Sequence, residues 1–197
     1  MLNGDWNEEN ALGKAEWIKF FGALYGKQKQ ATALFTKIEK DFLKTIRIAK
    51  MAKTTPNILA GDMFEDRWYL PKGSSWGSLL LKQANGNYLW QETSGTGSLS
   101  LSFETVFEKA KSADVWITSG QFSSLKEMTN SIPHYAEFNA FKNKNVYSFS
   151  GKKGKTGGIL YYELAHNRPD LVLKDLVKIL HPELLPSYEP FFFEKLK

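Results

Sequence analysis

The 197-residue chain contains no cysteine and only three histidines. The absence of cysteine excludes disulfide bonds and metal sites built on thiolates. The histidines, His134, His166 and His181, stand too far apart in the sequence for any familiar metal-ligand spacing. We therefore expect no metal site and no cofactor that this chain holds by itself.

Long apolar runs are also missing. No stretch approaches the roughly 20 apolar residues that a membrane-spanning helix needs. Residues 1–5, MLNGD, show neither the basic start nor the apolar stretch of a signal peptide. Taken alone, this pattern predicts a cytoplasmic protein, but it would carry little weight if the chain were a fragment of a longer precursor.

Basic and aromatic residues are abundant. The formal net charge is +5, and the chain has six Trp, eight Tyr and fourteen Phe. Such a composition suits nucleic acid and equally an anionic or aromatic small ligand. The hydrophobic fraction of 42% is sufficient for a globular core.

The segment from Leu12 to Met51 has no proline, and its apolar residues recur at helical spacing. This pattern predicts one long helix, with a bend near Gly26. Such a helix exceeds the average length in globular proteins, so we expect it to connect two bodies.

Strand-like and helical patterns alternate in the rest of the chain. Strands are expected at 57–64, 88–90, 114–118 and 145–149. Helices are expected at 73–82, 102–110, 123–130 and 169–181, and an exposed turn at 67–71. This alternation predicts an α/β fold with a mostly parallel sheet flanked by helices. In such sheets the ligand groups follow the carboxyl ends of the strands.

Three stretches carry a likeness to a known family. Residues 5–20 read DWNEENALGKAEWIKF, residues 102–117 combine a capped helix with an acid and an apolar strand, and residues 168–184 read RPDLVLKDLVKILHPEL. Their order resembles the periplasmic substrate-binding proteins of ABC importers, in the branch that binds iron-siderophores, haem and cobalamin. The resemblance covers most of the chain, and each stretch is a diffuse pattern.

The resemblance implies one lobe of a two-lobe binding protein together with a long connecting helix. Residues 1–13 would be a remnant of the N-terminal lobe, 14–51 the interlobe helix and 52–197 the C-terminal α/β lobe. The ligand would lie between the lobes, so this chain would carry half of the site. The implied partners are ABC permease subunits and a metal chelate, haem or corrinoid. The implied location of the protein is the periplasm or the outer face of the cytoplasmic membrane. No nucleic-acid partner is implied.

The family presents an exposed acid on each lobe to arginines of the permease, and Glu163 matches that position. A carboxylate that meets an arginine at an interface gains a bidentate, charge-assisted hydrogen bond. The alternative is an ordinary solvated acid.

Ligand contacts are expected just beyond the ends of the strands. The expected residues are Trp68, Tyr69, Gln121, Phe122, Lys152, Lys153 and Lys155. Aromatic faces can pack on a corrin, a porphyrin or a catecholate, and lysines can pair with carboxylates or an anionic ferric chelate. Packing within the lobe and a solvated loop remain the alternatives for these aromatic residues and lysines.

Other functions find less support. The stretch 150–156, SGKKGKT, resembles a phosphate-binding loop, but the required first glycine would fall at Phe149, so we expect no nucleotide hydrolysis. No histidine follows Ser119 or Ser123 at a spacing typical of catalysis, and we expect no enzyme. A basic α/β nucleic-acid-binding or interaction module remains the alternative, although it lacks a recognised motif. The sequence does not select among siderophore, haem and cobalamin.

Overall fold

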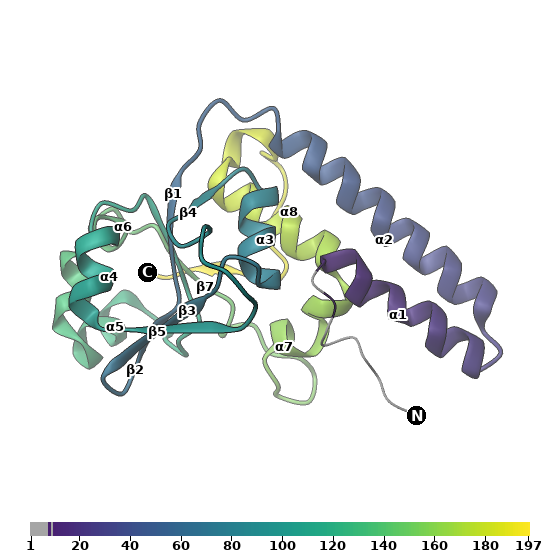
Figure 1. Cartoon of the computed structure of the whole chain (residues 1–197), viewed down its shortest axis with the longest axis horizontal. Coiled ribbons are helices and arrows are strands. Elements are labelled where there is room, and N and C mark those ends of the chain that lie inside the picture. The colour runs from purple at the N-terminus through teal and green to yellow at the C-terminus, as the bar shows by residue number, and fades with distance from the viewer. Residues whose placement is uncertain (1–7, 9) are drawn as a thin grey trace.

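The computed structural model describes residue 8 and residues 10–197. The chain opens with two helices, α1 (Ala11–Leu24) and α2 (Gln28–Ala49), which pack side by side as a hairpin that extends away from the rest of the molecule (Figure 1). The single helix expected over 14–51 is therefore divided. Gly26, at φ 66°, ends α1 in the left-handed conformation. The backbone N–H of Lys27 donates to the carbonyl of Gly22 at 2.6 Å, which closes the turn.

The 22-residue α2 is the long helix of the fold, and it packs along α8 (Pro169–Leu180). Its buried residues recur every three or four positions, which places them on one face. They are Ala31, Phe35, Ile38, Phe42, Thr45 and Ala49. The role of 14–51 as a connector between lobes, and the boundary proposed at residue 13, stay predictions.

A five-stranded sheet forms the centre of the molecule, in the order β4-β1-β6-β7-β8. Its strands are β1 (Asn57–Ala60), β4 (Asn87–Tyr88), β6 (Val115–Thr118), β7 (Val146–Ser148) and β8 (Glu194–Lys195). All neighbours are parallel except β8, which pairs antiparallel with β7. The expected α/β fold with a mostly parallel sheet is confirmed.

A second, antiparallel sheet has the order β2-β3-β5. It consists of β2 (Asp62–Phe64), β3 (Arg67–Pro71) and β5 (Ser98–Leu101). The strand expected at 57–64 is thus two strands, because Gly61 turns the chain at φ 76°. A Cβ at this position would overlap the carbonyl of Tyr69, so only glycine fits. The turn expected at 67–71 is strand β3.

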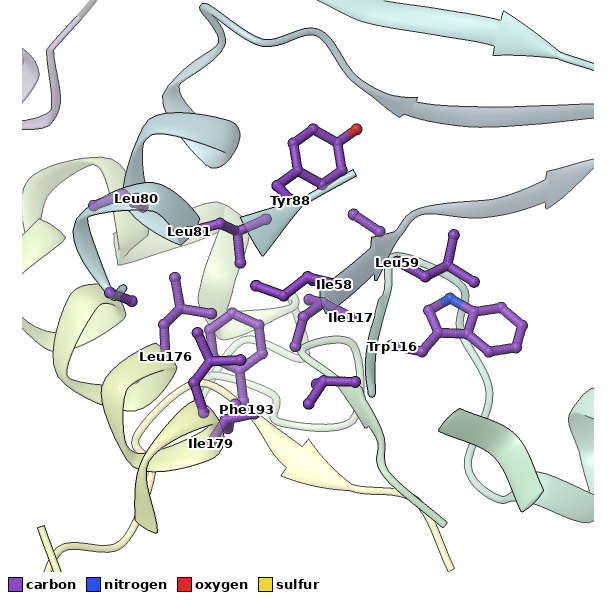
Figure 2. Packing of buried hydrophobic residues seen from close by; sticks show 14 of the residues in the cluster. Ile58, Leu59, Leu80, Leu81, Tyr88, Trp116, Ile117, Leu176, Ile179 and Phe193 are labelled. Atoms are coloured by element: carbon purple, nitrogen blue, oxygen red, sulfur yellow. The ribbon is translucent and has the colours of Figure 1, made fainter. Parts of the chain in front are cut away.

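Helices cover both faces of the parallel sheet. One face carries α3 (Trp76–Gln83) and α8, and the other carries α4 (Phe103–Ala110), α5 (Leu125–Ser131) and α6 (Asn139–Lys142) (Figure 1). Successive side chains of each strand point to opposite faces of the sheet, so each strand contributes to the core on both sides. Ile58 and Ile117 point towards α3 and α8, whereas Leu59 and Trp116 point to the opposite face (Figure 2). The remaining helix is α7 (Leu160–Leu164), and short 3-10 helices lie at Pro133–Glu137, Ala165–Asn167 and Pro182–Leu184.

The C-terminal tail is held by a buried carboxylate on α8. Asp175 is 0% exposed and accepts hydrogen bonds from the Tyr188 hydroxyl at 2.5 Å and from the backbone N–H groups of residues 191–193 at 2.6 to 3.3 Å. Burial raises the pKa of this carboxyl. These bonds hold residues 188–193 against α8 just before β8, which completes the sheet.

Candidate functional site

A pocket of about 250 Å³ opens at the edge of the parallel sheet where the strands end. Its floor is formed by the residues that directly follow β1, β6 and β7, which are Gly61, Ser119 and Phe149. Residues of β3, α3, α7 and α8 form its walls. The carboxyl edge of a parallel sheet is the usual ligand site of open α/β folds.

Four aromatic residues line this pocket: Tyr69, Phe149, Tyr161 and Phe193. The rings of Phe149 and Tyr161 are stacked, with centroids 4.1 Å apart and planes at 21°. The ring of Phe193 meets that of Phe149 edge to face at 5.9 Å. None of the described residues that line the pocket is charged. The surface therefore suits a flat, apolar part of a ligand.

A polar cluster lies next to the pocket floor. The Asp62 carboxylate accepts a hydrogen bond from the Thr118 hydroxyl at 2.6 Å and a long one from Ser119 at 3.5 Å. The Ser150 hydroxyl donates to the carbonyl of Gly120 at 2.8 Å. Burial raises the pKa of Asp62, which is only 8% exposed. The cluster fixes the turns that follow β1, β6 and β7.

Glu163 lies on the surface, in the short helix α7. Its Oε1 accepts a hydrogen bond from the Thr156 hydroxyl at 3.2 Å. Its carboxylate also lies against Gly154 and Gly158 of the preceding loop. The loop and α7 project from the body (Figure 1), and Tyr161 of α7 lines the pocket.

A family model of the periplasmic binding proteins matches residues 5–152, which is most of the chain. The chain belongs to the periplasmic binding protein family. It is 32% identical over 198 residues to an uncharacterised lipoprotein of Methanocaldococcus jannaschii, and that match covers 99% of this chain and 45% of the lipoprotein. The chain spans about half the length of the curated relatives it matches.

Solved structures share the fold of this periplasmic binding protein. One is the periplasmic heme-binding protein RhuT from Roseiflexus sp. RS-1, with a TM-score of 0.69 at 15% identity over 89% of this chain and 64% of that chain. Another is an ABC transporter solute-binding protein from Sulfurospirillum deleyianum, with a TM-score of 0.68 at 16% identity over 91% of this chain and 54% of that chain. At these identities the likeness shows the fold alone.

Of the two aromatic residues expected at the end of the first strand, only Tyr69 lines the pocket, with 42% of its surface exposed. Trp68, the other residue, lies in the core instead. Trp68 is 0% exposed, packs on Trp116 with centroids 5.3 Å apart, and donates its indole N–H to the Ala60 carbonyl at 3.0 Å. The two residues alternate along β3, so one faces the core when the other faces out.

Gln121 and Phe122 lie in the turn after β6 but do not line the pocket. Gln121 is exposed, whereas Phe122 is half-buried and packs edge-on against Tyr135 at 6.4 Å. A ligand contact by either residue stays a prediction.

The three lysines of the loop after β7 also lie outside the pocket. The ammonium group of Lys152 donates to the carbonyl of Pro190, in a separate depression near the C-terminus. Lys153 and Lys155 are exposed on the loop. They remain candidates for contact with the periphery of a ligand larger than the pocket.

Four residues of the pocket and its polar cluster are not among the contacts expected from the sequence: Asp62, Phe149, Tyr161 and Phe193. Asp62 has a usable signal, since an acid directly follows the glycine that ends a buried strand. Phe149 falls at the end of the strand expected at 145–149 and has no signal of its own. Within the described residues, no group of three or more His, Asp or Glu side chains is placed to hold a metal ion. In the same residues, every helix is too short or too polar to cross a membrane.

Proposed function

We propose that this chain forms one wall of the ligand site in a substrate-binding protein of an ABC importer. The cargo is an iron-siderophore, haem or a corrinoid, and any iron or cobalt arrives with it. The observation that carries the proposal is the aromatic pocket at the carboxyl edge of the sheet, in a chain of the periplasmic binding protein family. Binding and delivery require no catalysis, and we expect none.

The chemistry of the pocket favours a cargo with a flat apolar part. The stacked pair Phe149 and Tyr161 offers aromatic faces and edges to a macrocycle or a catechol ring. Lys153 and Lys155 are exposed on the adjacent loop and would pair with carboxylates at the periphery of such a ligand. The heme-binding protein among the structural neighbours supports this cargo class.

We further propose that a second lobe, belonging to a longer protein, closes the site from the opposite side. The chain spans about half the length of its curated relatives, which leaves room for such a lobe. The hairpin exposes aromatic residues that this lobe would cover: Phe20 and Phe21 are 38% exposed and Tyr25 is 76% exposed.

Delivery of the cargo requires docking on the permease, and we assign this contact to Glu163. Its exposed carboxylate suits a bidentate bond with an arginine of the permease. The lipoprotein among the relatives supports a location at the outer face of the cytoplasmic membrane. The ABC transporter protein among the structural neighbours supports a permease partner.

The test compares cargo affinity between the longer protein and its Phe149→Ala variant, by quenching of tryptophan fluorescence. We expect the variant to bind the cargo about twofold to tenfold more weakly, because one stacking face is lost. The matched control is Phe191→Ala, which removes a ring that is 41% exposed and lies outside the pocket. Equal affinities in all three proteins would contradict the assignment of the pocket. Binding of an oligonucleotide that weakens steeply with salt would favour a nucleic-acid-binding module instead.

A further inference from the structure

The loop between β7 and α7, residues 151–159, contains two glycines that face the Glu163 carboxylate. A Cβ built on Gly154 would lie 2.5 Å from Oε2, and one built on Gly158 would overlap Oε1. Neither glycine has a positive φ, so the backbone conformation does not require glycine at these positions. A side chain at either position would displace the Glu163 carboxylate, which is the end of a flexible side chain.

The loop is folded closely onto itself around this carboxylate. The N–H of Gly154 donates to the carbonyl of Gly158 at 2.8 Å, and the N–H of Leu160 donates to that of Lys152 at 2.9 Å. The Thr156 hydroxyl donates to Glu163. Glu163 thus closes the loop from the side of α7.

The same loop joins the two stacked rings of the pocket. Phe149 precedes the loop, and Tyr161 follows it on α7. Tyr161 is only two residues from Glu163, and both lie on one short helix. A change in the loop or in α7 therefore acts on the stack that lines the pocket.

We propose that Glu163 is a latch that holds loop 151–159 closed in the free protein, and that an arginine of the docking partner releases it. A guanidinium group binds both carboxylate oxygens and carries the opposite charge, whereas Thr156 offers one uncharged hydroxyl at 3.2 Å. The partner and the loop compete for one carboxylate, so docking opens the loop and loosens the stack of Phe149 and Tyr161. This inference rests on the docking role proposed for Glu163 and adds its consequence for the cargo.

The latch is tested first on the chain alone, by hydrogen exchange and by trypsin digestion. Glu163→Ala removes the carboxylate, and Gly158→Ala displaces it without changing Glu163. We expect both variants to exchange the amides of Gly154 and Leu160 about tenfold faster and to be cut sooner after Lys155. Glu183→Ala, which removes another exposed acid, is the control and should match the wild type. Unchanged exchange in both latch variants would overturn the proposal.

The second test measures docking of the longer protein on its ABC permease, reconstituted in lipid nanodiscs. The partner and the loop compete for the Glu163 carboxylate. A variant that keeps this carboxylate but weakens its hold on the loop should therefore dock more tightly. We expect Gly158→Ala and Thr156→Val to dock about threefold to fivefold more tightly, as the loss of one long, exposed hydrogen bond would give. Glu163→Ala should lose docking.

The outcomes separate the two claims. If Glu163→Ala docks normally, the docking role is wrong, and faster exchange in the loop would leave Glu163 as a structural contact only. If docking needs Glu163 but neither Gly158→Ala nor Thr156→Val docks more tightly, the docking role stands and the latch is wrong.

Discussion

Replacement of Asp175 by asparagine is the most direct test of how the C-terminal tail, and with it one wall of the pocket, is held. Each carboxylate oxygen accepts two hydrogen bonds: Oδ1 from the Tyr188 hydroxyl and the Phe191 amide, and Oδ2 from the Phe192 and Phe193 amides. Asparagine has nearly the same shape but only one acceptor oxygen. Its NH₂ group must therefore face at least one pair of buried donors.

The expected loss follows from the two donors that lose their acceptor. A buried donor without a partner costs about 1–3 kcal/mol, so two cost about 2–6 kcal/mol. The variant also avoids the burial of a charge, the effect that raises the pKa of Asp175 and offsets part of this loss. We expect the free energy of unfolding to fall by about 2–4 kcal/mol.

Urea unfolding followed by circular dichroism measures this change. The control is Asp41→Asn on the surface of α2, where the carboxylate pairs with Lys37 at 2.7 Å. That exposed pair should contribute no more than about 0.5 kcal/mol. If the free energy of unfolding of Asp175→Asn lies within about 0.5 kcal/mol of the wild-type value, the four hydrogen bonds contribute little and Asp175 does not hold the tail.

Two further predictions concern the strand ends and the hairpin. Burial raises the pKa of Asp62 above its ordinary value of 3.8, so ionisation of this carboxyl favours the unfolded chain. The stability that the protonated carboxyl gives the wild type below about pH 4 is therefore lost as the pH rises through the raised pKa. Asp62→Asn should therefore gain stability relative to the wild type between about pH 4 and pH 7 in thermal unfolding, whereas a constant or opposite difference would contradict the burial argument. Gly26→Ala should lower the free energy of unfolding by about 1 kcal/mol, since φ is 66° there. The control is Gly77→Ala in α3, where a Cβ meets nothing within 4 Å. We expect Gly77→Ala to leave the free energy of unfolding unchanged or to raise it, whereas Gly26→Ala lowers it.

The elements with local signals could be predicted from the sequence. The terminal helix begins at Pro169 and ends at Leu180, as the proline at its first position and the apolar spacing indicate. Strand β3 could not be predicted, because it depends on pairing with β2 and β5 rather than on its own residues. For the same reason, the sequence did not show which of Trp68 and Tyr69 faces the core.

The pocket depended on contacts between distant parts of the chain. Phe193 reaches Phe149 and Tyr161 because Asp175 holds the tail against α8, an arrangement that no local pattern indicates. Glu163 was predicted from the resemblance, but its contact with Gly154 and Gly158 appears only in the folded loop. The lysines after β7 lie outside the pocket because the end of a strand places the residue that follows it, Phe149, at the pocket but does not fix the course of the loop beyond.

We propose that this lobe helps to bind an iron-siderophore, haem or a corrinoid. The longer protein that we propose contains this chain should therefore be titrated with a ferric catecholate siderophore, a ferric hydroxamate siderophore, haemin and cyanocobalamin, and binding followed by tryptophan fluorescence. We expect one of these ligands to bind saturably, with one ligand per protein and micromolar or tighter affinity. If none of them binds saturably, the proposed cargo class is wrong.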